Sequence, residues 1–145
     1  MVRHTSLLIS TFAGKLRGSG DITTNRVCNH TKAPYRIGSL VSVCDHFYTV
    51  AQTGEPQCYE LATGEEVWKQ EKLPRVETYG SMVHADGRLY VISTRGDAFV
   101  FTASPKYELL ATNSLDEGTT ASMAVSGGEL FLRTARTLWC ISEKK

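Results

Sequence analysis

The sequence predicts an all-β protein made of a repeated unit of about 40 residues, and three observations support this prediction. The segment Ser39–Tyr48 can be placed over Ser81–Tyr90 at an offset of 42 residues, and Ser122–Phe131 follows at an offset of 41. Apolar residues nowhere recur over several turns at the spacing i, i+3, i+4, i+7 that marks an amphipathic helix. Short apolar runs instead follow one another roughly every 8–12 residues, with glycine-containing turns between them, which is typical of antiparallel strands.

Each repeat unit contains the signals of four short strands. In the copy that begins at Ser81, the first expected strand is Ser81–Ala85, and Asp86-Gly87 is a two-residue hairpin turn in which glycine adopts a positive φ at little cost. The next three expected strands are Leu89–Ser93, Ala98–Thr102 and Glu108–Thr112. A period of about 40–45 residues with four strands per unit is typical of a β-propeller, so we expect a partial β-propeller of four-stranded antiparallel blades.

Residues that recur at equivalent positions of the repeat are interpreted as structural. Gly54 falls on Gly96, and Trp68 falls on Leu110. A weaker copy at offset 40 precedes these units, and in it Cys28 stands at the position of Trp68. The complete set of signature residues is Gly54, Thr63, Gly64, Trp68, Asp86, Gly87, Tyr90, Gly96 and Trp139.

The length of 145 residues corresponds to about three and a half units. We expect a single partial propeller domain over 1–145, with units at approximately 1–34, 35–76, 77–117 and 118–145. Propellers usually close with about 4–8 blades, so the sequence predicts either the carboxyl-terminal part of a longer propeller or a natural half-ring. Open terminal blades expose strand edges and apolar faces that favour association. We therefore expect a homodimer in which two chains close a ring of about seven blades.

The segment Cys58–Trp68 resembles the repeat of pyrroloquinoline-quinone-type propellers, in which Thr63-Gly64 forms the tight turn and Trp68 docks between blades. Further stretches resemble bacterial PQQ-binding-like β-propeller repeat proteins, and the resemblance extends over about residues 8–143. These stretches are Gly20–Thr23, Arg36–Ser39, Gly80–Tyr90, Leu109–Ser114, Leu130–Thr134 and Leu138–Ile141. The resemblance implies the carboxyl-terminal part of a bacterial propeller protein with a periplasmic or extracellular location.

The chain departs from the quinoprotein dehydrogenases of this superfamily at the residues that hold their cofactor. Those enzymes use a vicinal Cys-Cys disulfide, a stacking Trp and a calcium site made of Glu, Asn and Asp. No calcium ligand set can be assigned here, and the cysteines include neither an adjacent pair nor a zinc-type spacing. We therefore expect no metal and no cofactor, pyrroloquinoline quinone included, and the disulfide state is left open. The four cysteines are Cys28, Cys44, Cys58 and Cys140.

Isolated candidates for catalysis have simpler structural explanations. Ser39 and Ser81 each follow a glycine, but they lack the second glycine and the helix of a serine-hydrolase nucleophile motif, and both occupy the same position of the repeat. The histidines, His4, His30, His46 and His84, form no metal-binding pair. Basic and aromatic residues could line a face or channel that binds a partner. These residues are Arg36, Arg75, Arg133, Arg136, Tyr79, Trp68 and Trp139.

Charge and hydropathy argue against two kinds of partner. Sixteen Lys and Arg against 15 Asp and Glu leave a net charge of +1 without any run of five like charges, so no nucleic-acid-binding face is expected. No apolar run approaches the roughly 18–20 residues that span a bilayer. The amino-terminal apolar run is interrupted by Thr and Ser and lacks a small-x-small cleavage site, which favours a β-strand over a signal peptide.

The sequence predicts a non-catalytic β-propeller scaffold that binds a protein or a ligand. The scaffold is favoured over an enzyme because the chain contains no motif that carries chemistry by itself. The alternative is an enzyme, either an oxidoreductase related to the quinoproteins or a small hydrolase whose site forms at an oligomer interface.

Overall fold

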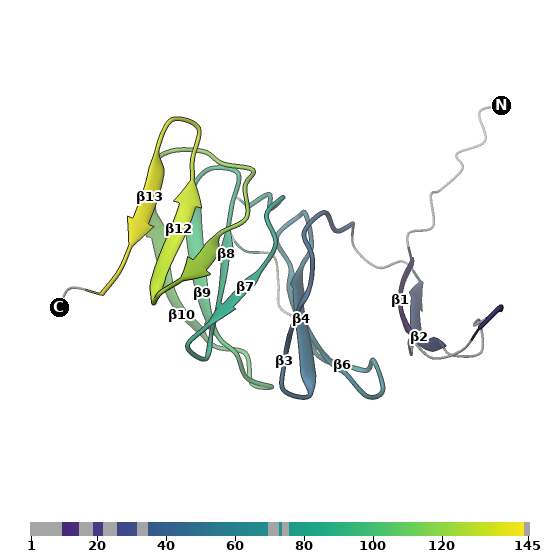
Figure 1. Ribbon diagram of the computed structural model, residues 1–145. Helices are drawn as coiled ribbons and strands as arrows, with labels where there is room; N and C mark the ends of the chain where they lie inside the picture. Colours follow the sequence, from purple (N-terminus) through teal and green to yellow (C-terminus); the bar gives the residue numbers. More distant parts are fainter. Residues whose placement is uncertain are drawn as a thin grey trace, which may run out of the picture.

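A computed structural model describes residues 10–14, 19–21, 26–31, 35–69, 73 and 76–143, with side chains described for residues 19–21 and from residue 35 onward within these ranges. Every regular secondary-structure element in these ranges is a β-strand (Figure 1), which confirms the predicted all-β class. Thirteen strands form four antiparallel sheets, which we number along the chain.

The strands of each sheet are hydrogen-bonded in sequence order. The first sheet contains β1 (Ser10–Gly14) and β2 (Arg26–Thr31). The second sheet contains β3 (Val41–Val43), β4 (His46–Val50), β5 (Pro56–Glu60) and β6 (Glu66–Lys69). The third sheet contains β7 (Val83–Ala85), β8 (Arg88–Ile92), β9 (Asp97–Thr102) and β10 (Leu109–Ser114). The fourth sheet contains β11 (Ala124–Ser126), β12 (Glu129–Arg133) and β13 (Leu138–Ile141).

The hairpin between β7 and β8 turns at Asp86-Gly87, the two residues that the sequence predicts. Both have positive φ, 48° for Asp86 and 69° for Gly87, as a two-residue hairpin turn of type I′ requires. Gly127-Gly128 occupies the same position between β11 and β12, also with positive φ. The repeat therefore fixes the same local backbone at equivalent turns.

Strand β7 begins at Val83 rather than at Ser81, because Ser81 connects successive sheets. The Ser81 hydroxyl oxygen accepts a hydrogen bond of 2.9 Å from the backbone N–H of Ser39, and the Ser122 hydroxyl oxygen accepts one of 2.9 Å from Ser81. The preceding glycine is also required, since a Cβ on Gly80 would lie 2.7 Å from the backbone oxygen of Ala121. The motif Gly80-Ser81 is thus part of the packing between sheets.

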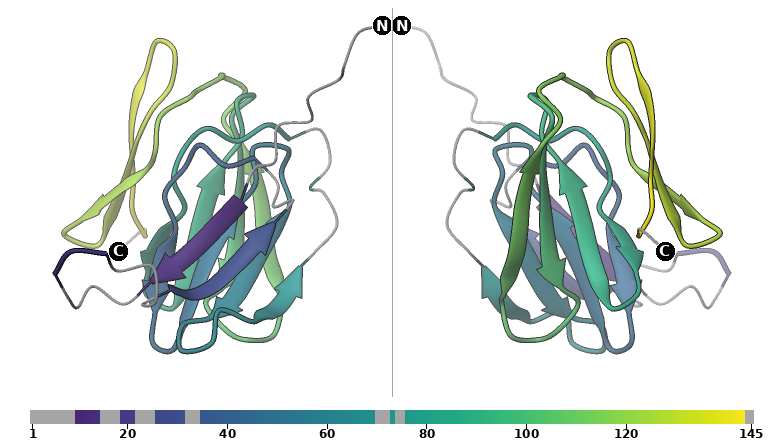
Figure 2. Two further views of the ribbon diagram at one scale, coloured as in Figure 1. Left: turned by 90° about the vertical axis from the view of Figure 1, so that its right-hand side faces the viewer. Right: turned by 90° about the vertical axis from the view of Figure 1, so that its left-hand side faces the viewer.

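The second, third and fourth sheets follow one another in a row with their faces together (Figures 1 and 2). The larger core lies between the second and third sheets and includes the buried side chains of Tyr48, Cys58, Leu89 and Phe101. A smaller core around Ile92, Met123 and Leu132 joins the third and fourth sheets. Sheets two, three and four fall within the predicted units 35–76, 77–117 and 118–145, while the borders of the units, and the whole of unit 1–34, stay a prediction.

A candidate binding groove beside the fourth sheet

A groove of about 1300 Å³ lies between the third and fourth sheets, at the end where the β7–β8 and β11–β12 hairpins turn. Its apolar wall includes Tyr90 from the third sheet and Val125, Leu130 and Ile141 from the fourth. The register explains this wall, because Val125 pairs with Leu130 and Leu130 pairs with Ile141 across the three strands. Val125 is 40% exposed and Ile141 is 43% exposed, so the apolar row is only partly covered.

The equivalent space between the second and third sheets is filled. Tyr48, Leu89 and Phe101 stand at the repeat positions of Tyr90, Leu130 and Ile141, and at most 1% of each side chain is exposed. Trp68 from β6 and Tyr107 from the connection between β9 and β10 cover them.

Ring contacts describe how this aromatic cover is packed. The ring centroids of Trp68 and Tyr107 lie 5.2 Å apart in an edge-to-face arrangement, and those of Trp68 and Tyr48 lie 6.1 Å apart. The Trp68 indole N–H donates a hydrogen bond of 3.4 Å to the backbone oxygen of Ser104. Strand pairing corrects the sequence expectation that Trp68 corresponds to Leu110: Trp68 pairs with Cys58 as Ala111 pairs with Val100, and Leu110 is a bulged residue. Because Ala111 stands at the position of Trp68, the groove lacks this aromatic ring.

The outer edge of β13 forms the second part of the candidate site. In the second and third sheets, the corresponding strands β5 and β9 are each paired on that edge by a fourth strand, β6 or β10. Among the residues that the structure describes, no strand pairs with the outer edge of β13. Its unpaired backbone N–H and C=O groups can therefore accept an added strand.

The face of the fourth sheet that points away from the third sheet is exposed, and we call it the outer face. It carries Ala124, Phe131, Leu138 and Cys140, of which Leu138 is 73% exposed. Partial burial and the neighbouring carboxylate of Glu129 raise the pKa of the Cys140 thiol. The equivalent face of the third sheet is covered by the fourth sheet.

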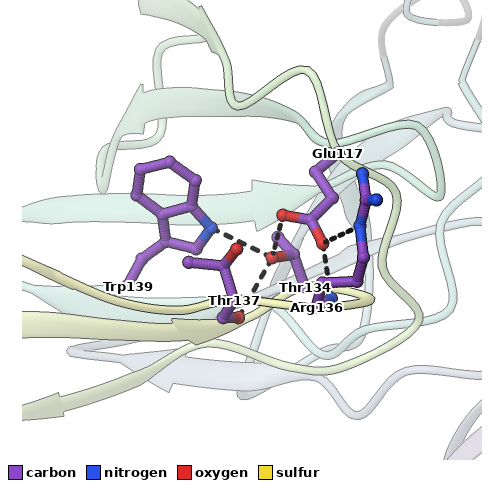
Figure 3. Close-up of polar contacts among 5 residues, drawn as sticks. All are labelled: Glu117, Thr134, Arg136, Thr137 and Trp139. Atoms are coloured by element: carbon purple, nitrogen blue, oxygen red, sulfur yellow. Dashed lines mark hydrogen bonds and ion pairs between the residues drawn. The ribbon is translucent and has the colours of Figure 1, made fainter.

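A polar cluster joins the connection before the fourth sheet to the β12–β13 turn (Figure 3). The Trp139 indole N–H donates to the Thr134 hydroxyl over 3.0 Å, and this hydroxyl lies 2.9 Å from a Glu117 carboxylate oxygen. The other oxygen of Glu117 accepts from the backbone N–H of Arg136 and lies 3.9 Å from its Nε.

The electrostatics of this cluster favour an ionised Glu117. Desolvation alone would raise the pKa of Glu117, but hydrogen bonds involving Thr134 and Thr137, the Arg136 N–H and the Arg136 charge together hold it below its usual range. Both oxygens of the carboxylate are engaged, so the cluster is suited to fixing the turn. A small cavity of about 380 Å³ lies beside it, lined by Thr94, the 118–121 segment and the 133–135 segment.

The residues that the sequence singled out for partner binding are spread over the molecule. Arg36 donates to Gln57 and, over 3.2 Å, to the hydroxyl of Tyr59. The hydroxyl of Tyr79 accepts from Gln52 over 3.4 Å. Trp68 lies between two sheets, and Arg136 and Trp139 belong to the polar cluster. Arg75 and His4, as well as the side chains of His30 and Cys28, lie outside the described residues.

His84 lines the groove, whereas His46 lies on β4. The described part of the chain contains no group of three or more His, Cys, Asp and Glu that could hold a metal. Within the same ranges, Cys44, Cys58 and Cys140 are free thiols, and no helix is long and apolar enough to cross a membrane. Burial raises the pKa of the Cys58 thiol to about 11.

Sequence reasoning did not find the groove or the polar cluster. The absence of an aromatic residue from Leu109–Ser114, the strand equivalent to that of Trp68, was a visible signal of an altered contact between sheets. The role of Tyr107 was hidden, because it lies in an irregular connection with no repeat pattern of its own.

Antiparallel sheets that recur every 41 or 42 residues and pack face to face are typical of the class of β-propellers. A family profile described as "Outer membrane protein assembly factor BamB" matches residues 52–145. The chain belongs to this family, which confirms the resemblance that the sequence predicted.

Solved structures support the fold. The crystal structure of BamB from Moraxella catarrhalis matches with a TM-score of 0.67 at 15% identity, over 81% of this chain and 34% of that chain. A europium-containing methanol dehydrogenase matches with a TM-score of 0.50 at 10% identity, over 61% of this chain and 19% of that chain. The chain thus spans about a third of the length of that BamB chain, and the partial propeller fold is confirmed. No curated protein matches the chain in sequence.

Proposed function

We propose that the chain is a non-catalytic β-propeller scaffold that binds protein through the outer face of its fourth sheet, and that a second copy of the chain is one such partner. The observation that carries the proposal is the uncovered outer face, on which Leu138 is 73% exposed, Ala124 is exposed and Phe131 is half-buried. The residues at the matching positions of the third sheet all pack against the core beneath the fourth sheet; these residues are Val83, Tyr90 and Ala98.

The occupant of the outer face is inferred from the two preceding junctions, where this face is covered by another sheet of the same repeat. A second copy supplies sheets of this kind. Burying a side chain such as Leu138 that is otherwise exposed contributes about 1.5–3 kcal/mol, so a few such residues provide a driving force for association. The absence of adjacent cysteines in the sequence supports the further proposal that this scaffold holds no quinone.

The oligomeric state of the purified chain tests the proposal. Sedimentation velocity over ~1–100 µM should show a dimer that dissociates on dilution. Leu138→Lys should shift the chain to monomer because it places a charge in the contact. Leu61→Lys, at an exposed apolar residue in the β5–β6 turn, is the matched control and should leave the dimer intact. A wild-type chain that stays monomeric over this range would contradict self-association through the outer face.

A further inference from the structure

We propose that the groove between the third and fourth sheets is a second binding site, distinct from the outer face, for an extended segment of another protein. The segment would add to the free edge of β13 as a fourth strand and insert a large aromatic side chain against Tyr90, Leu130 and Ile141. This inference deepens the proposed scaffold function and rests on it, since it names the class of partner that the scaffold takes.

The junction between the second and third sheets shows how one segment can both insert an aromatic side chain and add an edge strand. After β9 the chain passes the β7–β8 turn, where the Ala103 N–H donates a hydrogen bond of 2.9 Å to the Gly87 oxygen. It then places the ring of Tyr107 5.7 Å from that of Phe101 and 5.2 Å from that of Trp68. Finally it pairs with the outer edge of β9 as β10. An aromatic side chain followed by an edge strand is therefore the chemistry that this repeat position accepts.

The groove offers the same surface without that cover. Tyr90 and Leu130 are only partly buried and Ile141 is exposed, whereas their counterparts between the second and third sheets are fully buried. A volume of about 1300 Å³ exceeds the roughly 300–1000 Å³ of a small-molecule pocket, so it has room for a large aromatic side chain and part of the backbone that carries it. Covering the apolar row would remove it from water, which favours binding.

The charges at the rim specify the partner further. Three carboxylates, those of Asp86, Glu129 and Glu143, line the groove together with Arg88 and His84. The three carboxylates outnumber the two basic groups, so this rim carries a net negative charge and a basic residue beside the aromatic one is favoured. The chain's own covering segment has this arrangement, with Lys106 directly before Tyr107. We therefore infer a segment in which Lys or Arg precedes Tyr, Phe or Trp and an apolar strand follows.

A synthetic peptide with the sequence of residues 103–114 is the probe, and the full chain is the host. Titration followed by ¹⁵N-resolved NMR and by calorimetry should give a Kd on the order of 10–100 µM, with shifts at Tyr90, Leu130 and β13. A control peptide with Ser at the position of Tyr107 should bind at least about tenfold more weakly. The host variant Ile141→Glu should weaken binding of the first peptide by a similar factor.

Ala124→Lys on the outer face is the matched host control, because Ala124 lies on β11, away from the edge of β13, and it should leave the peptide affinity within about twofold. It also separates the two proposals, because this variant places a charge in the contact between copies and leaves the groove and the β13 edge unchanged. Equal binding of both peptides, no binding, or shifts confined to the outer face would overturn the groove proposal. A chain dimer that the free peptide dissociates would also overturn it, because a second copy rather than another protein would then occupy the groove.

Discussion

The junction between the second and third sheets and the junction between the third and fourth use the same repeat positions but differ in their cover. At the first, the aromatic rings of Trp68 and Tyr107 close the space over Leu89 and Phe101. At the second, the counterpart of Phe101 is the exposed Ile141, and a groove remains. Closure of a junction therefore depends on a few aromatic side chains supplied by the outer strand and its connection.

Other contacts are the same at both junctions. The serine hydrogen bond measures 2.9 Å in each, from Ser39 to Ser81 and from Ser81 to Ser122. The N–H of Leu73 donates to Gly54 over 3.0 Å, and the N–H of Leu115 donates to Gly96 over 3.0 Å. Backbone contacts therefore set how successive sheets are placed, while side chains of the outer strands decide how much apolar surface is buried.

Truncation of matched core positions should show the largest difference between the two junctions. Phe101→Ala should lower the free energy of unfolding by about 3–5 kcal/mol, because it leaves a cavity in the closed core. Ile141→Ala should cost less than about 1 kcal/mol, because 43% of the side chain is already exposed and its loss leaves no closed cavity. Urea denaturation followed by circular dichroism measures both values. Equal losses would show that the groove is closed in solution.

Thiol modification compares the closed junction between the second and third sheets with the outer face of the fourth sheet, without changing the packing of either. Cys58 and Cys140 occupy matched strand positions, paired with Tyr48 and Phe131 respectively. Cys58 is buried and burial raises its pKa to about 11, whereas Cys140 is exposed. In a background with the other two cysteines replaced by Ser, iodoacetamide should modify Cys140 at least about a hundredfold faster at pH 8.

Dilute protein is needed for this labelling, because self-association through the outer face would protect Cys140. A rate for Cys140 that falls with protein concentration would support the proposed dimer. Similar rates for the two thiols in dilute native protein would contradict the difference in burial between Cys58 and Cys140. The urea-unfolded chain is the reference, and in it the two thiols should react at similar rates.

The sequence predicted most of the fold because the fold is local and repeated. The Asp86-Gly87 turn and the alternation of short strands are visible in a single unit. Strand limits were less predictable: the strand expected at Ser81–Ala85 is Val83–Ala85, because Ser81 bonds across sheets and Met82 fills the core between them. Such contacts depend on residues about 41 positions away, which local patterns do not report.

The candidate site was less predictable for a related reason. The groove depends on a side chain that the repeat replaces, Ala111 at the strand position of Trp68, whereas a constant offset of 42 places Leu110 there. It depends also on Tyr107, whose place after β9 is irregular. The polar cluster depends on Glu117, whose partners Thr134 and Arg136 lie 17 and 19 residues further along the chain. Neither the groove nor the polar cluster is marked by a recognisable motif in the sequence.

The aromatic cover can be tested by removing the Trp68 ring and comparing it with a change at an exposed position of β10. Trp68→Leu should lower the free energy of unfolding by about 2 kcal/mol, because Leu cannot reach both Tyr48 and Tyr107. Leu110→Trp is the control; it should change stability by less than about 0.5 kcal/mol, since Leu110 is an exposed bulge residue that covers no junction. If Trp68→Leu were neutral, the assignment of closure to the aromatic cover would be wrong.

The smallest expected effect concerns Glu117, which stands at the repeat position of the buried Val76 and so replaces an apolar contact by a polar one. Its folded-state pKa is lowered, so the ionised carboxylate stabilises the fold above the unfolded-state pKa of about 4.3, and this contribution is lost as the pH falls through the lower folded-state pKa. Glu117→Gln should therefore be less stable than wild type at pH 7 and should lose less stability on acidification.

Thr134→Val should behave similarly because it removes the hydroxyl partner of Glu117, while Thr134→Ser should retain wild-type behaviour. Urea denaturation at a series of pH values measures this, and parallel stability curves for wild type and Glu117→Gln below pH about 5 would show that the carboxylate does not fix the turn.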